Sequence, residues 1–243
     1  MITASERISR IVPRCRTFLC ARERGHYLLQ VHLPVETPPI PPLYSFDLDR
    51  QLHEWLDCKL AAALPAWQAK DGLDDDSVPC ICPQFGIGEH SAWLGMEMRL
   101  QEATCLPVPL LEDLSEVDKL VLREETRWYR YMEEGYRYLR SRQDGAFLLS
   151  VRGALGPMDL ANALRGDDLF TDVLLDPTGV HKLMGFCTRA LVWWYPRILR
   201  WADQVEGGHI FMYTGSWMGP LGLGHITNDA AMLCGNASER GNR

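Results

Sequence analysis

Short apolar runs and longer amphipathic stripes alternate along this chain. The short runs are rich in leucine, β-branched and aromatic residues, which is typical of buried strands. They predict strands at residues 26–33, 78–82, 146–151 and 209–213. Elsewhere, apolar residues recur every three or four positions, which predicts helices that bury one face. The predicted helices begin after Asp47, cover residues 91–98, 112–142 and 158–165, and begin again at Pro177.

The order of these elements predicts how the strands pair. A strand, a helix and a second strand in that order need a crossover connection, so the strands should be parallel. The expected fold class is therefore α/β, with a parallel sheet that is either open or closed as a barrel. Four such units make half of a (β/α)8 TIM barrel, which usually takes about 250 residues. We expect an incomplete barrel of about four β/α units, whose open sheet edges favour a homodimer.

The same patterns define the expected domain organisation. One domain is expected over residues 1–243, because no internal repeat or low-complexity linker divides the chain. Residues 1–25 predict a basic, amphipathic, helical lead-in that Pro13 should break. Residues 234–243 are polar and patternless, and we expect them to form a disordered tail.

Composition excludes several classes of partner. A net charge of −7 gives no general attraction to nucleic acid or to acidic membranes. No apolar run is long enough to span a membrane, and no apolar signal core follows the N-terminal arginines. The eight cysteines follow no even framework, which is typical of a reducing compartment. We therefore expect a cytoplasmic protein that binds neither nucleic acid nor membranes.

Polar side chains follow three of the predicted strands, where the active sites of barrels lie. These candidate substrate-binding residues are Gln84, Glu89 and His90 after the second strand, Arg152, Asp159 and Asn162 after the third, and Ser216 after the fourth. No residue among them stands out as catalytic.

Each of these candidates also has a structural interpretation. Glu89 and His90 suit either acid/base work or a solvated loop pair. Arg152 suits either a bound anion or an internal ion pair. Asp159 suits either a ligand contact or the first turn of a helix, where the dipole favours a carboxylate. Ser216 has no base nearby in sequence, which favours a hydrogen-bonding role over a nucleophilic one.

Three segments resemble one known family. Residues 147–166, FLLSVRGALGPMDLANALRG, are followed by LLDP at 174–177 and resemble the central strand, loop and helix of the uroporphyrinogen decarboxylase family. The sequence GSWMG at 215–219 resembles the segment after that family's next strand. Upstream, AWLGME at 92–97, with Pro107 and Pro109 in the following loop, resembles a third family segment. The resemblance covers residues 78–233 in order and spacing.

The resemblance implies a (β/α)8 barrel and one of two chemistries. The first is cofactor-free decarboxylation of a carboxylated tetrapyrrole by a carboxy-lyase. The second is zinc-dependent methyl transfer to or from corrinoids and thiols. Because the resemblance ceases after residue 233, it also implies a chain truncated at its C-terminal end.

This sequence departs from both branches of the family. The decarboxylases carry arginines after the first strand, where residues 32–36 contain none. Their pyrrole-binding aspartate falls on Gly86 and their substrate-contacting tyrosine falls on Asn162, while their serine is kept as Ser216. The methyltransferases use a His-x-Cys…Cys zinc set, whereas Cys80 and Cys82 have no histidine nearby in sequence.

These observations together predict a uroporphyrinogen decarboxylase-like protein, by resemblance a lyase of porphyrin metabolism. The alternatives are a corrinoid-dependent methyltransferase-like protein and an inactive truncated fragment of either. The expected ligand is a tetrapyrrole, a corrinoid or another carboxylated small molecule. We expect no metal and no cofactor.

Overall fold

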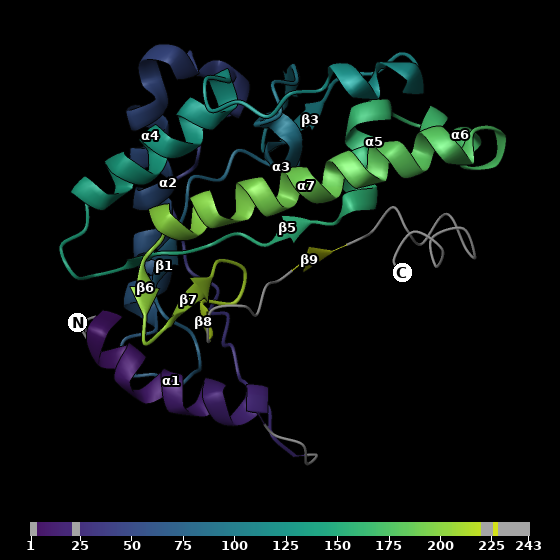
Figure 1. The fold of residues 1–243 in the computed structure, drawn as a ribbon. Coiled ribbons are helices and arrows are strands. Elements are labelled where there is room, and N and C mark those ends of the chain that lie inside the picture. Colours follow the sequence, from purple (N-terminus) through teal and green to yellow (C-terminus); the bar gives the residue numbers. More distant parts are fainter. Residues whose placement is uncertain (1–3, 21–24, 220–225, 228–243) are drawn as a thin grey trace. The chain divides into compact units, whose positions relative to one another are not determined.

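The computed structural model describes residues 4–20, 25–219 and 226–227 of the chain (Figure 1). Its residues cluster into two compact units. Of the described residues, the first unit comprises 4–20, 25–83, 133–152 and 198–219, and the second comprises 84–132, 153–197 and 226–227. Each unit is described below by itself.

The helices are α1 (Ala4–Cys20), α2 (Leu48–Ala69), α3 (Glu89–Ala92), α4 (Arg127–Ser141), α5 (Pro157–Arg165), α6 (Asp168–Leu175) and α7 (Pro177–Trp201). Two 3₁₀ turns cover Leu43–Ser45 and Leu114–Lys119. The strands are β1 (Cys80–Ile81), β2 (Met98–Leu100), β3 (Cys105–Pro107), β4 (Leu148–Leu149), β5 (Ala154–Leu155), β6 (Gln204–Val205), β7 (Gly208–Phe211), β8 (Ser216–Met218) and β9 (Ile226–Thr227). The chain is thus mixed α/β, with short strands.

Parallel pairing organises the sheet of the first unit. Strands β1 and β4 are parallel neighbours, with Cys80 opposite Leu148. A parallel bridge between Val151 and Phe211 then joins the end of β4 to β7. The prediction of parallel strands at 78–82, 146–151 and 209–213 is therefore confirmed. The sheet continues differently, because β6, β7 and β8 pair in antiparallel fashion.

Strand β8 brings this sheet back to the segment that leads into β1. The backbone N–H of Val78 donates to the carbonyl of Gly215 over 2.8 Å. The hydroxyl of Ser216 donates to the carbonyl of Asp76 over 3.3 Å. Gly215 has a φ of +64°, and a Cβ placed on it would lie 2.8 Å from the carbonyl oxygen of Val78. Only glycine therefore allows both this turn and this close approach.

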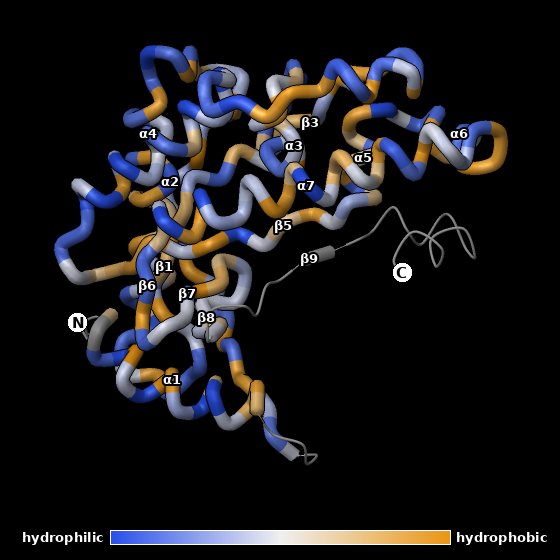
Figure 2. The backbone as a smooth tube through the Cα atoms, viewed as in Figure 1, coloured by the Kyte–Doolittle hydropathy of each residue, from blue (hydrophilic) through white to orange (hydrophobic). Residues whose placement is uncertain are grey.

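Helix α1 packs its apolar face on the same strands. Its buried residues share one cluster with β7 and β8; the cluster contains Ala4, Ile11, Val12, Cys15, Val78, Ile210 and Trp217. Apolar and polar positions alternate along the helix, as expected of an amphipathic lead-in (Figure 2). The predicted break at Pro13 is wrong, because one helix runs from Ala4 to Cys20. Pro13 lies on the exposed face of the helix, while Val12 and Cys15, on either side of it in sequence, are buried.

The second unit is built around short helices and an aromatic cluster. Strands β2 and β3 form an antiparallel hairpin, and β5 and β9 pair in parallel. Helix α5 packs against α3 and α6. Trp93 stacks on Trp194 with ring centroids 4.7 Å apart and an interplanar angle of 9°, and Tyr129 meets Trp194 edge-on. These rings pack together in the interior of this unit.

One predicted element is wrong in kind, and another is wrong in its bounds. Residues 26–33 form no strand, because two of their backbone N–H groups, those of Leu29 and Val31, donate to aspartate side chains. The predicted helix over 91–98 stops at Ala92, and Gly95, with a φ of +95°, turns the chain towards β2.

The predicted helix over 112–142 is also wrong in its first half. Only its second half is an α-helix, α4, and the first half holds a 3₁₀ turn capped by Asp113. Thr126 supplies the cap of α4, because its hydroxyl accepts from the N–H of Tyr129 over 3.2 Å. Helix α6 had no counterpart in the prediction, whereas α5 and the start of α7 at Pro177 are confirmed. The predicted tail at 234–243 lies outside the described residues.

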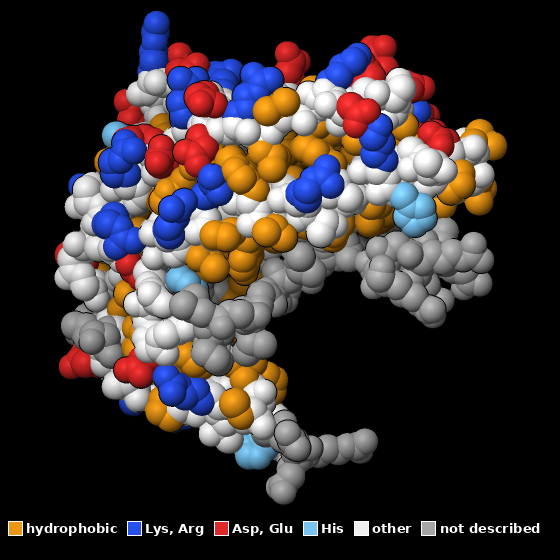
Figure 3. Space-filling view, in the orientation of Figure 1, with side chains coloured by type: hydrophobic (Ala, Val, Ile, Leu, Met, Phe, Trp, Pro, Cys, Tyr) orange, Lys and Arg blue, Asp and Glu red, His pale blue; other side chains and the backbone are white. Residues whose placement is uncertain are grey.

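The surface carries mixed charge. On the face drawn in Figure 3, basic and acidic side chains are interspersed over the described part of the chain. Among the described residues, no helix is both long enough and apolar enough to cross a membrane.

Replacing Gly215 by alanine should destabilise the protein. The new Cβ would meet the carbonyl of Val78 at 2.8 Å and would sit at a positive φ. We expect a loss of about 2–4 kcal/mol of unfolding free energy, from backbone strain and overpacking together. Urea denaturation followed by circular dichroism measures this loss.

Gly145→Ala is the matched control for this prediction. Gly145 also has a positive φ, of +92°, but its Cβ would meet nothing within 4 Å. It should cost only the conformational strain of about 1–2 kcal/mol. Equal losses in the two variants would mean that β8 does not press against the segment before β1.

Candidate functional site

Arg152 lies where the sequence placed it, at the end of a parallel strand. It follows Val151, whose bridge to Phe211 joins β4 to β7, and only 7% of its surface is exposed. Its Nε donates to the hydroxyl of Tyr213 over 2.7 Å, and its guanidinium lies 5.6 Å from the centre of the Tyr213 ring. Arg152 and Tyr213 therefore meet at the C-terminal ends of β4 and β7.

Ser216 lies on the other side of β7. Phe211 pairs with Ser216 in β8 and bridges Val151 just after β4, so β7 separates Ser216 from the segment that carries Arg152. The Ser216 hydroxyl is buried and donates to the carbonyl of Asp76. This hydrogen bond is made to the chain itself, so the role of Ser216 in substrate binding stays a prediction.

The other five candidates belong to the second unit. Glu89 starts α3, is buried, and accepts a hydrogen bond from the N–H of Phe85. His90 on the same helix and Gln84 before it are half-buried. The remaining two, Asp159 and Asn162, lie on α5, which packs against α3; Asp159 is buried, and the Asn162 amide donates to the carbonyl of Gly166 over 3.1 Å. The structure thus brings the α3 and α5 candidates onto neighbouring helices.

Gly86 occupies the position where the resemblance expects an aspartate. Its φ is +121°, and a Cβ placed on it would lie 2.4–2.5 Å from atoms of Thr104 and Cys105. No side chain fits at this position without moving the backbone. The departure from the decarboxylase pattern is therefore built into the fold of the β2–β3 region.

A buried charge network that the sequence reading missed lies in the first unit. Arg7 on α1 donates from Nη1 to Oδ1 of Asp75 over 3.0 Å, and Lys70 at the end of α2 donates to Oδ2 over 2.9 Å. The Ser77 hydroxyl and the N–H of Val31 donate to the same Oδ2, over 2.8 and 3.2 Å. The Asp75 side chain is completely buried. One carboxylate thus joins α1 and the segment that contains Val31 to residues 70–77.

Opposing effects act on the Asp75 carboxyl. Burial alone would raise its pKa, but hydrogen bonds from Lys70, Ser77 and the Val31 N–H outweigh burial and hold the pKa below its ordinary value. Asp75 is therefore ionised at neutral pH, as its two cationic partners require.

A second set of ion pairs extends this network along α1. Arg14 pairs with Asp74 at 2.7 Å and with Asp76 at 3.2 Å, and Arg10 lies 3.6 Å from Asp74. A signal for these contacts exists in the sequence. Arg7, Arg10 and Arg14 follow helical spacing, so they share one face of α1. The acidic turn at residues 74–76 supplies three carboxylates that match them.

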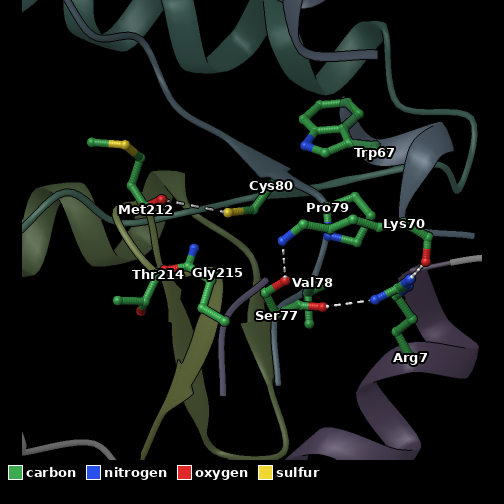
Figure 4. A pocket seen from close by; sticks show the side chains of 11 residues that line it. Arg7, Trp67, Lys70, Ser77, Val78, Pro79, Cys80, Met212, Thr214 and Gly215 are labelled. Atoms are coloured by element: carbon green, nitrogen blue, oxygen red, sulfur yellow. Dashed lines mark hydrogen bonds between the residues drawn. The ribbon is translucent and has the colours of Figure 1, made fainter. Parts of the chain in front are cut away.

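A pocket of about 100 Å³ opens beside the network (Figure 4). Its polar side chains include Arg7, Lys70 and Ser77, and Cys80 also faces it. Its remaining lining is Gln30, Trp67, Val78, Pro79, Met212, Thr214 and Gly215. In Figure 4, Cys80 lies towards Met212, and Lys70 points towards Ser77. The pocket therefore combines two cations with a wall that is partly polar, at Gln30, Ser77 and Thr214, and partly apolar, at Trp67, Pro79 and Met212.

Cys80 is an uncharged thiol in this pocket. Burial raises the pKa of Cys80 to about 12, and the nearby Ser150 hydroxyl and Lys70 ammonium lower it only in part. Its Sγ points at the carbonyl of Met212, 4.0 Å away. A thiol with so high a pKa is a poor nucleophile and a poor metal ligand at neutral pH.

The described residues do not fit the zinc set that the resemblance implies for methyl transfer. Among residues 4–20, 25–219 and 226–227, no three His, Cys, Asp or Glu side chains gather closely enough to hold a metal ion. Cys80 would also have to lose its proton before it could bind zinc.

Replacing Asp75 by asparagine should cost stability in a pH-dependent way. Asparagine leaves Arg7 and Lys70 buried without a counter-charge, and we expect a loss of about 3–5 kcal/mol at pH 7. Because folding lowers the pKa of Asp75, its ionised form stabilises the protein above the unfolded pKa of about 3.9. The stability gap between the two proteins should therefore shrink as the pH falls below about 4. Urea denaturation from pH 7 to pH 3 measures the gap.

Asp74→Asn is the control for this prediction. Its side chain is 61% exposed and pairs with arginines at the surface, so water screens the loss. It should destabilise far less than Asp75→Asn. A pH-independent gap for Asp75→Asn would show that the charge of Asp75 contributes nothing to the fold.

Comparison with known proteins finds a similar fold, but no relative by sequence. No family model and no curated protein matches this chain. Among solved structures, a methyltransferase from Methanosarcina mazei matches with a TM-score of 0.50 and 11% sequence identity. The match covers 83% of this chain and 57% of the methyltransferase, so this chain spans little more than half the length of that protein. At this identity the match shows similarity of fold alone.

Proposed function

We propose that this chain is a methyltransferase-like α/β-barrel protein that holds a tetrapyrrole-type ring, a corrinoid or a carboxylated porphyrin, at the C-terminal ends of β4 and β7. The observation that carries the proposal is Arg152, buried at the end of β4 against Tyr213 after β7. Ligands of parallel α/β folds bind at this end of the strands. The likeness in fold to a methyltransferase supports the same reading.

The geometry around Arg152 suits an anionic group on such a ring. The Tyr213 hydroxyl accepts from Nε, and the Tyr213 ring lies against the guanidinium, so both contacts orient its planar fork. A planar guanidinium matches the geometry of a carboxylate or phosphate group. Arg152 would thus supply binding and orientation, while the chemistry of a bound corrinoid belongs to the corrinoid itself.

Gly86 favours the methyltransferase-like reading over the decarboxylase-like one. Decarboxylation of a uroporphyrinogen would need a donor or acid to hold the pyrrole nitrogens. The family position for that group has no room for a side chain in this protein. The decarboxylase resemblance therefore contributes the class of ligand to the proposal, and not the reaction.

Titration with hydroxocobalamin and with coproporphyrin, followed by visible absorbance, tests this proposal. We expect saturable binding of one of these ligands to the full chain. Arg152→Gln should weaken that binding about tenfold or more, because it removes a charge-assisted hydrogen bond. Tyr213→Phe keeps the ring but loses the hydroxyl that orients Nε, so its loss should be smaller.

Arg130→Gln is the matched control, because Arg130 is an exposed arginine of α4. It should bind as the unaltered protein does. Circular dichroism of each variant separates a lost ligand contact from a lost fold. Absence of saturable binding in the folded protein, or equal affinities in Arg152→Gln and Arg130→Gln, would contradict the proposal.

A further inference from the structure

We propose that the pocket beside Lys70 and Cys80 binds a small monocarboxylate, such as an acetate- or propionate-sized anion. The pocket lining does not include Arg152, so this site is additional to the one proposed above. Three properties of the pocket support it: its charge, its hydrogen-bond donors and its apolar wall.

The charge of the pocket is unbalanced by one. Arg7 and Lys70 both donate to Asp75, so two cations share one carboxylate. Buried charge is costly unless it is paired. A bound monoanion would bring the sum of these charges to zero, whereas a dianion would reverse its sign.

The two cations also keep N–H groups for a ligand. Within the described part of the chain, the Lys70 ammonium donates to Asp75 and to the Ser77 hydroxyl, which uses two of its three N–H groups. On the same basis, Arg7 uses three of its five N–H groups, on Asp75 and on the carbonyls of Ser77 and Lys70. Both side chains line the pocket, so we place the carboxylate of the ligand against them.

The other wall of the pocket suits a short carbon chain. Trp67, Pro79 and Met212 present apolar surface, and Cys80 faces the pocket as a neutral thiol that does not repel an anion. The volume of about 100 Å³ is several times the roughly 10–15 Å³ that a single water needs, so a small carboxylate has room. A fully polar anion such as phosphate would place its oxygen atoms against these apolar side chains, which is unfavourable.

Thermal unfolding of the full chain in acetate, propionate, phosphate or chloride at constant ionic strength tests the proposal. A ligand that binds the folded state alone raises Tm. At about a hundredfold excess over its Kd, propionate should raise Tm by about 5 °C relative to chloride. Quenching or enhancement of tryptophan fluorescence, to which Trp67 contributes, should give the same Kd.

Two variants separate the pocket from general salt effects. Cys80→Leu fills the pocket and keeps both cations, and it should lose the Tm response to carboxylates. Lys70→Gln should weaken the binding of propionate at least tenfold in the fluorescence titration. Lys119→Gln alters a lysine whose side chain is 76% exposed, and this variant should bind propionate with unchanged affinity. Equal responses to propionate and chloride, a phosphate response as large as that to propionate, or a response that survives in Cys80→Leu would each overturn the proposal.

Discussion

The buried carboxylate of Asp75 is the contact on which the first unit depends. It accepts hydrogen bonds from α1, from the end of α2, from Ser77 just before β1 and from the extended segment that contains Val31. Arg7 and Val31 are more than forty residues from Asp75 in sequence, whereas Lys70 and Ser77 are its near neighbours. Because the carboxylate lies out of contact with water, each partner must stay in place or leave a charge unpaired. The apolar face of α1 can then cover Val78, Ile210 and Trp217, and the sheet that carries the candidate site rests on that cluster.

Polar side chains of the first unit gather at two places. One is the C-terminal end of β4 and β7, where Arg152 meets Tyr213. The other is the pocket between the network and the β7–β8 turn, which Arg7, Lys70 and Cys80 line together. The first follows from the general logic of parallel α/β folds, which gather strand ends at one edge. The pocket is not explained by parallel strands. It arises because β8 returns to the segment before β1.

Local sequence patterns correctly predicted those strands and helix starts that depend mainly on neighbouring residues. The apolar runs at 78–82, 146–151 and 209–213 gave three parallel strands, and Pro177 marked the start of α7. The segment at 26–33 reads as a strand but is not one, because its N–H groups donate to Asp75 and Asp76, more than forty residues away. Arg152 could be placed at a strand end, but its partner Tyr213 could not be named from spacing. The need for glycine at positions 86 and 215 depends on backbone from distant segments, which no single-sequence pattern reports.

A double-mutant cycle between Arg7 and Asp75 tests most directly whether this network holds the first unit together. The unfolding free energies of Arg7→Met, Asp75→Asn and the double variant would be measured in urea at pH 7. A shared buried ion pair predicts that the double variant loses less than the sum of the single losses, with a coupling of about 2 kcal/mol. Losses that add to within about 0.5 kcal/mol would contradict the account, because they would show that α1 and the acidic turn stabilise the protein independently.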